Sequence, residues 1–171
     1  VLKLALDNDW YTYWRTPGDS GLAPTFDWSK SVNVKEAVIG WPAPQRMEQE
    51  GMYSFGYKGV VEIPVTLIPQ EVGKPMIAAL DMTAIVCNKI CVPQTLNIRN
   101  TVPSGVAIKS PYYDYFNEMQ AKVPNAANEN LKLETAVLGK DALVFTLYSK
   151  TGFEGVDVFV ESNDIILTAP P

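Results

Sequence analysis

The sequence predicts a mainly β protein, a β-sandwich with one short helix and a second small β module. Short apolar runs alternate with polar residues at the period of two that is typical of strands, most clearly in Gly59–Ile68. The 11 glycines and 13 prolines are scattered between these runs, where turns are expected. A single segment, which begins at Ser110, has the apolar spacing of a good amphipathic helix.

The first part of the chain, residues 1–109, holds enough short strands for a sandwich. Strands are expected at Val1–Leu4, Asp9–Arg15, Thr25–Trp28, Val32–Trp41, Gly59–Ile68, Met76–Val86 and Thr95–Asn100. Pro64 interrupts one of them and indicates an edge strand or a bulge, because proline cannot donate to a ladder. Residues 45–58 fit either an exposed aromatic loop or an irregular strand.

A helix over residues 110–124 is expected to link this part to the rest. Ser110 is suited to the N-cap and Pro111 to the first helical position, and Pro124 ends the pattern. The apolar face consists of Tyr112, Tyr115, Phe116, Met119 and Val123. Residues 125–171 form the second β module, which is too short for a complete sandwich. Its expected strands are Leu131–Leu138, Leu143–Tyr148, Val156–Glu161 and Ile165–Thr168.

Composition excludes several classes of function. The chain has no histidine, so a Ser-His-Asp triad, a Cys-His dyad and a histidine metal site are impossible. The net charge of −5 and the lack of a basic stretch argue against nucleic acid as a partner. The apolar runs are far shorter than the roughly 20 residues that span a bilayer. Carboxylates, hydroxyls, amines and one pair of thiols are left for chemistry.

That pair, Cys87 and Cys91, allows one disulfide, one two-thiolate metal site or two unrelated buried thiols. The strand before Cys87 and the Val-Pro after Cys91 favour a strand–turn–strand segment. Opposed residues there are about 4.5–5.5 Å apart at Cα, which suits a disulfide. A bridge across so short a loop stabilises the fold by only about 2 kcal/mol, which favours a redox role over a purely structural one. Lys89, between the cysteines, could favour the thiolate or be a solvated turn residue.

Copper(I) is the metal alternative, because soft thiolates select it. Met76 and Met82, in the preceding strand, could add soft ligands, although core packing is the favoured explanation for them. Tetrahedral zinc would need two more cysteine or histidine ligands, which the chain lacks. A plain interaction sandwich with a local staple is the third hypothesis.

Four blocks of sequence resemble the amino-terminal periplasmic domain of the DsbD-type disulfide reductases. They are Trp10–Gly21, Trp41–Pro44, Phe55–Gly59 and Val86–Pro93. The spacing of the cysteines is most similar to that of the suppressor-of-copper-sensitivity (ScsB) branch. The resemblance covers about residues 8–124, and the remainder resembles the following β module of that branch.

The resemblance implies an immunoglobulin-like redox domain over residues 1–109, in the periplasm and within an inner-membrane protein. It implies a protein-disulfide reductase domain without a cofactor or metal, which takes electrons from the transmembrane and carboxy-terminal domains of its own full-length chain. It then passes them to periplasmic thioredoxin-fold proteins through mixed disulfides. By position, Cys91 matches the cysteine that forms the mixed disulfide, and Cys87 matches the one that resolves it.

The resemblance also implies an aromatic cap loop that shields the cysteines from stray oxidants. Phe55 matches its phenylalanine, with Tyr53 and Tyr57 as neighbours. DsbD has a longer gap between its cysteines and acidic residues before that phenylalanine. In this chain Tyr53 and Ser54 stand there, and the nearest carboxylates belong to Glu48 and Glu50.

Overall fold

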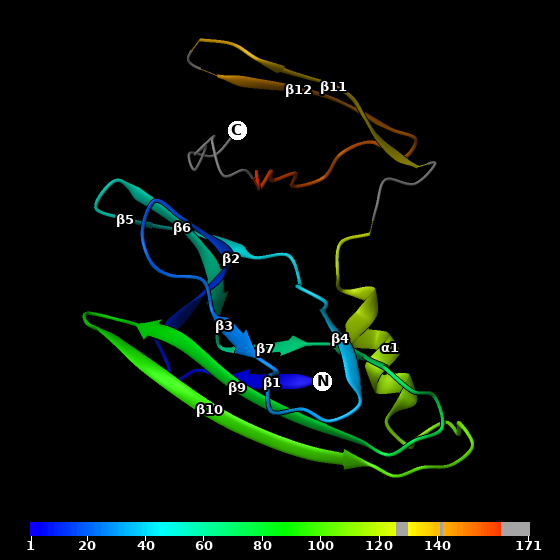
Figure 1. The fold of residues 1–171 in the computed structure, drawn as a ribbon. Coiled ribbons are helices and arrows are strands. Elements are labelled where there is room, and N and C mark those ends of the chain that lie inside the picture. Colours follow the sequence, from blue (N-terminus) through cyan, green and yellow to red (C-terminus); the bar gives the residue numbers. More distant parts are fainter. Residues whose placement is uncertain (126–129, 141, 162–171) are drawn as a thin grey trace. The chain divides into compact units, whose positions relative to one another are not determined.

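The computed structural model describes residues 1–125, 130–140 and 142–161 (Figure 1). The chain divides into two compact units, Val1–Val123 and Pro124–Pro171. Each is described by itself, and the expected domain boundaries at residues 109 and 124 stay a prediction. In the described part of the chain, no helix is long and apolar enough to span a membrane.

The largest sheet of the first unit is antiparallel and contains six strands. Its order is β10 (Cys91–Val102), β9 (Met76–Cys87), β2 (Tyr11–Gly18), β6 (Met52–Lys58) and β5 (Gln45–Gln49), while β3 (Thr25–Asp27) also pairs with β9. Figure 1 shows β9 and β10 as the long green hairpin. The sequence predicts these two strands, and the structure extends the second to the residue at which the turn ends.

Two smaller sheets complete the unit: β1 (Leu2–Ala5) pairs with β7 (Val60–Ile63), and β4 (Val34–Ile39) pairs with β8 (Val65–Pro69). The prediction of one continuous strand over Gly59–Ile68 is therefore wrong. Pro64 divides it into β7 and β8, which belong to different sheets. The reason is that the buried Pro64 has no N–H for a ladder, so the chain changes partner there.

The core lies on one face of β9. Leu80, Met82 and Ala84 are all buried, and residues of two other segments, β1 and the segment of β3, pack against them: Leu2, Leu4, Phe26 and Trp28. Alternation along β9 directs these three side chains to one face and the odd-numbered side chains to the other. Cys87 therefore lies on the face opposite the Met82 core.

The ambiguous segment 45–58 is a hairpin, β5–β6. Glu50 and Gly51 occupy its tip with φ of 52° and 79°, and Gln49 pairs with Met52. A two-residue turn with positive φ at both positions matches the right-handed twist of the strands that it joins. Neither expectation for this segment, an exposed loop or an irregular strand, describes so regular a hairpin.

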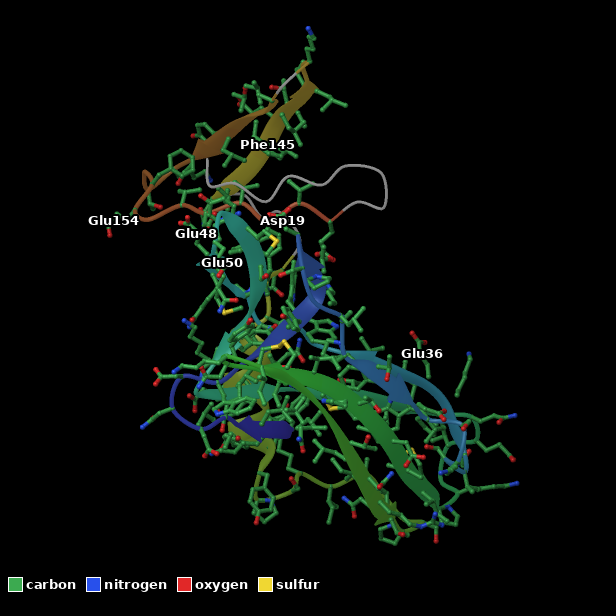
Figure 2. The ribbon with its side chains drawn as sticks, turned by 90° about the vertical axis from the view of Figure 1, so that its left-hand side faces the viewer. Asp19, Glu36, Glu48, Glu50, Phe145 and Glu154 are labelled. Carbon is green, nitrogen blue, oxygen red and sulfur yellow. A yellow bond between two sulfur atoms is a disulfide. The ribbon has the colours of Figure 1, made fainter. Side chains whose placement is uncertain are left out.

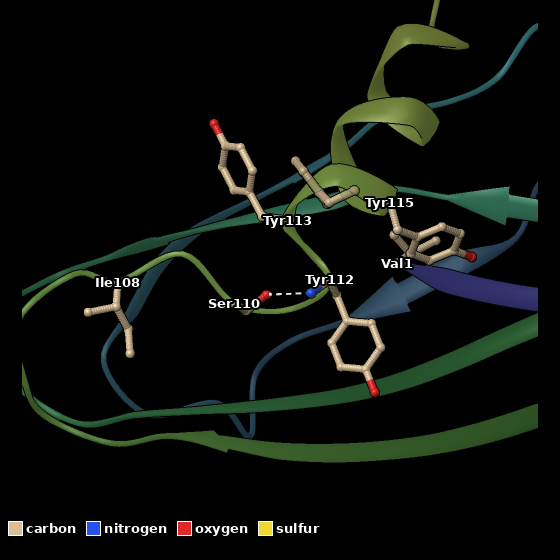
Figure 3. Close-up of a pocket in the computed structure, with 7 residues that line it drawn as sticks. Val1, Ile108, Ser110, Tyr112, Tyr113 and Tyr115 are labelled. Carbon is tan, nitrogen blue, oxygen red and sulfur yellow. Dashed lines mark hydrogen bonds between the residues drawn. The ribbon is translucent and has the colours of Figure 1, made fainter.

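The helix α1 (Tyr113–Ala121) begins later than expected. Ser110 does not cap it. The Ser110 hydroxyl instead accepts a hydrogen bond from the Tyr112 N–H at 3.2 Å, in a turn before the helix (Figure 3). Of the apolar face predicted for this helix, only Met119 is fully buried, whereas Tyr112 is 74% exposed and lines an open pocket of about 540 Å³. The tyrosines can stay near water because their hydroxyls need polar partners, as Tyr115 finds in Glu62 at 2.7 Å.

The second unit contains the antiparallel hairpin of β11 (Leu131–Leu138) and β12 (Leu143–Ser149), as predicted. Residues 156–161, expected to be a strand, contain none. The Asp157 carboxylate accepts a hydrogen bond from the Val158 N–H at 2.8 Å, a local bond of the kind that competes with sheet ladders. The strand expected at Ile165–Thr168 lies outside the described residues.

Candidate functional site

Cys87 and Cys91 form a disulfide across the turn that joins β9 to β10. Cys87 is the last residue of β9, Cys91 is the first of β10, and the two are directly opposite in the ladder. Their Cα atoms are 4.1 Å apart and the sulfurs are bonded (yellow in Figure 2). Of the arrangements that the sequence leaves open, the structure contains the disulfide.

The two sulfurs have unlike surroundings. Cys87 is completely buried, whereas Cys91 is exposed at the start of an outer strand. The Tyr13 hydroxyl lies 3.4 Å from the Cys87 sulfur. Because a disulfide sulfur has no proton to give, Tyr13 is the donor of this hydrogen bond. The buried Cys87 sulfur therefore accepts a hydrogen bond from the Tyr13 hydroxyl.

Aromatic and thioether side chains enclose Cys87. Tyr11, Tyr13 and Met47 are buried with it in one cluster. Tyr11 is directly opposite Cys87 in the β2–β9 ladder, and alternation places Tyr13 on the same face. The two tyrosine rings meet edge to face with centroids 5.5 Å apart, and the Tyr11 hydroxyl donates to the Gln49 side chain at 3.0 Å.

The Tyr13 ring is held in place by the loop that follows β2. A Cβ atom on Gly21 would lie 2.2 Å from that ring, and the φ of Gly21 is +96°, so glycine is required on both counts. Asp19 fixes the loop to β6, because its N–H donates to the Tyr53 carbonyl and its carboxylate accepts from the Tyr53 N–H, both at 2.8 Å. The hydroxyl that faces Cys87 is thus positioned by the loop after β2 and by the hydrogen bonds of that loop to β6.

Burial raises the pKa of Tyr13 from 10.0 to about 12, and the neighbouring Tyr11 adds to the effect. The hydroxyl stays protonated, and able to donate to a sulfur, throughout the range in which free thiols ionise. A phenol can stabilise a thiolate in this way without being a base.

The raised pKa of Tyr13 predicts a specific alkaline loss of stability. The fold favours the protonated phenol, so this contribution is complete below pH 10.0 and is lost as the pH rises to about 12. The free energy of unfolding of the oxidised protein should fall more steeply across this window than that of Tyr13→Phe. Urea unfolding at a series of pH values measures both slopes, and parallel curves would contradict the account.

The three residues expected to form a cap loop lie on strand β6 instead of a loop. Tyr57 is opposite Thr12 in the β2–β6 ladder, whereas Tyr11 is opposite Cys87. Alternation therefore directs Tyr53, Phe55 and Tyr57 to the sheet face away from Cys87. A role for them in shielding the disulfide stays a prediction.

Each of the three is already engaged by other parts of the fold. Phe55 is 1% exposed, with the Arg46 guanidinium 4.9 Å from its ring centre. The Tyr57 hydroxyl donates to the Pro42 carbonyl at 2.8 Å, and burial raises the pKa of Tyr57. Tyr53 is half-buried, and its backbone binds Asp19.

The charged residues considered near the thiols are exposed. Lys89 lies in the turn between the two cysteines, where its effect on the thiols stays a prediction. Asp19, Glu48 and Glu50 belong to the β5–β6 hairpin and the loop bound to it (Figure 2).

The methionines raised as copper ligands are not brought to the cysteines. Met82 is fully buried in the core on the opposite face of β9, and Met76 begins that strand at the end far from Cys87. Within the described residues, no three Cys, His, Asp or Glu side chains gather as a metal site would require. Met47, which no sequence pattern singles out, is the methionine that packs against Cys87.

A mainly β domain whose disulfide joins an exposed cysteine to a buried one has the arrangement of a thiol–disulfide exchange domain. The chain belongs to the family of the N-terminal domain of the thiol:disulfide interchange protein DsbD. The sequence model of that family matches residues 1–103, which include both cysteines and Tyr13.

The structure is similar to the crystal structure of the N-terminal periplasmic domain of ScsB from Proteus mirabilis, with a TM-score of 0.74 and 20% sequence identity. The likeness covers 95% of this chain and 63% of that one, and it confirms the predicted immunoglobulin-like, mainly β fold. No curated protein sequence matches the chain.

Proposed function

We propose that this chain is a periplasmic protein-disulfide reductase domain that passes electrons through Cys87 and Cys91 to thioredoxin-fold proteins. One observation carries the proposal: a disulfide that joins the exposed residue Cys91 to Cys87, which is buried and faces a hydroxyl donor. Family membership supports the chemistry, and the likeness to a periplasmic domain supports the compartment.

The reaction begins with both cysteines reduced. The Cys91 thiolate attacks one sulfur of the partner's disulfide, a mixed disulfide forms, and the partner's second sulfur leaves as a thiolate. The Cys87 thiolate then attacks the Cys91 sulfur, the bond between Cys91 and the partner breaks, and the partner's first sulfur leaves. Two electrons pass to the partner, which becomes a dithiol, and the Cys87–Cys91 disulfide of this structure is the oxidised product.

Geometry supports these separate roles. Thiol–disulfide exchange proceeds in line, so the entering and leaving sulfurs lie on opposite sides of the sulfur that is attacked. Cys87 approaches Cys91 from β9, and the partner's sulfur must therefore lie beyond β10. Attack at Cys87 would instead require a partner to enter between Tyr11 and Tyr13, which bury it.

Tyr13 assists the resolving step through its hydroxyl. Its hydrogen bond stabilises a negative charge on Cys87, and bonds to charged groups are stronger than neutral ones. This raises the fraction of Cys87 thiolate available to resolve the mixed disulfide. Electrons return to the pair from the transmembrane and carboxy-terminal domains of the full-length chain, within an inner-membrane protein.

Electron transfer to a defined acceptor tests the proposal. The reduced chain is mixed with oxidised thioredoxin, remaining thiols are alkylated, and both proteins are weighed by mass spectrometry. We expect Cys87 and Cys91 to become oxidised as the acceptor gains two alkylated thiols. A reduced chain that left every thioredoxin-fold acceptor oxidised would refute the function.

A further inference from the structure

The strand that begins with Cys91 lies at the edge of its sheet. β10 pairs with β9 on one side, and none of the described strands pairs with it on the other. Figure 1 shows β10 as the outer strand of the long green hairpin. It is 12 residues long, and all but one of these residues are exposed. An open edge of this length can accept a further strand, a liability that proteins usually suppress with charges. β10 carries one charged residue, Arg99.

The ladder shows which backbone groups of β10 point outward. In an antiparallel pair, opposed residues alternate between exchanging hydrogen bonds and directing them away. On β9, Ile77 exchanges its backbone bonds with Val32, and Ala79 exchanges its own with the Ser31 hydroxyl. The Ile85 carbonyl accepts from the Thr12 hydroxyl. All three residues therefore direct these groups away from β10.

The partners of these residues on β10 must likewise point outward. They are Thr101, Arg99 and Pro93, and alternation adds Cys91, Thr95 and Asn97. Two details agree with this outward direction. Proline, which has no N–H, is tolerated at position 93 because no hydrogen bond to β9 is needed there. The Thr101 N–H donates to the Asn100 side chain at 2.9 Å instead of to β9. Near the disulfide, the outer edge therefore offers the backbone groups of Cys91 and Thr95 and the carbonyl of Pro93.

We propose that the partner docks by adding an extended segment, the one that carries its reactive cysteine, to the edge of β10 beside Cys91. The inference rests on the proposed function and deepens it. In-line exchange brings the partner's sulfur to the outer side of Cys91. Disulfide-bonded residues lie about 4.4–6.8 Å apart at Cα, which is also the spacing of paired strand residues. A mixed disulfide at Cys91 thus brings the partner's chain to the distance at which backbone pairing occurs.

Thr95→Pro tests this docking, because it removes an outward N–H and leaves the ladder to β9 intact. The oxidised variant is reacted with a β-prone peptide that has one central cysteine, and separately with 2-mercaptoethanol, which has no backbone. We expect the peptide to react about three- to tenfold more slowly than with the unaltered chain, the effect of one net hydrogen bond. The rate with 2-mercaptoethanol should not change.

Thr101→Pro is the matched control, since it makes the same substitution at an outward position about 20 Å from Thr95 and farther from Cys91. Thr95→Ala separates the loss of the hydroxyl from the loss of the N–H. Both should react with the peptide at the normal rate. The unaltered chain is also reacted with a second peptide, which is methylated at the backbone amides beside its cysteine. The rate of each peptide is divided by its rate with a small aromatic disulfide. The methylated peptide should have the lower ratio.

Equal rates for the two peptides, or equal slowing in Thr95→Pro and Thr101→Pro, would overturn strand addition. A dimer in sedimentation that Thr95→Pro disperses would also overturn it, because a second copy would then occupy the edge. In each case, normal opening by 2-mercaptoethanol and normal transfer to thioredoxin would leave the proposed function standing. If Cys91 exchanged with neither, the function itself would fail.

Discussion

Replacing Cys91 with alanine is expected to abolish electron transfer completely, whereas replacing Cys87 should stop the reaction half-way. Cys91→Ala leaves a thiol that is buried under Tyr11 and Tyr13 and cannot be reached. Cys87→Ala leaves the exposed thiol, which forms a mixed disulfide that no second cysteine resolves. Alkylation and mass spectrometry of the thioredoxin reaction distinguish the two outcomes.

The two variants control for each other. Each loses the same short disulfide, which contributes about 2 kcal/mol to the free energy of unfolding. Because Cys87→Ala also leaves a cavity at a buried position, the free energy of unfolding of both variants is measured, and reactivities are compared under conditions in which both are folded. Equal trapping by both variants would show that burial of Cys87 does not decide which sulfur reacts.

Gly56→Ala is expected to destabilise the first unit by about 3 kcal/mol. A Cβ atom at Gly56 would lie 1.9 Å from the Thr12 carbonyl oxygen and 3.0 Å from the end of the Met47 side chain. The carbonyl belongs to the backbone of β2, which cannot rotate away as a side chain can. The strands must separate beside Tyr13, which is opposite Gly56 in the ladder.

Urea unfolding of the oxidised chain measures this loss, with Gly105→Ala as the matched control. A Cβ atom at Gly105 meets no atom within 4 Å, so that variant should change the free energy of unfolding by less than about 0.5 kcal/mol. An unchanged denaturation midpoint for Gly56→Ala would contradict the close approach of β2 and β6. Because the same strands hold Tyr13 over Cys87, Gly56→Ala should also slow transfer to thioredoxin.

The parts of the fold that depend on local pattern could be predicted from the sequence. Alternation finds β9 and the β11–β12 hairpin, and the short spacing of Cys87 and Cys91 indicates a bridge across a turn. Pro64 is recognisable as an interruption. Its effect, a transfer of the chain from one sheet to another, depends on strands far away in the sequence and could not be predicted from the local pattern.

The environment of the disulfide depends on contacts between distant segments. Alternation places Tyr11 and Tyr13 on one face of their strand, but nothing local shows that Cys87, 74 residues after Tyr13, lies opposite that face. For the expected cap residues, the local pattern suggests a place beside the cysteines that the register does not give them. Phe55 and Tyr57 are aromatic, near glycines and similar to a known motif, yet the ladder register directs them to the other face. Register, which a sequence pattern does not fix, decides both cases.

The location of the mixed disulfide tests the central claim most directly. The reduced, unaltered chain is mixed with oxidised thioredoxin and quenched rapidly with acid, and the mixed disulfide is digested and mapped by mass spectrometry. The account predicts that the partner is bound to Cys91, with Cys87 present as a free thiol. A partner bound mainly to Cys87 would contradict the division of roles between the exposed and the buried sulfur.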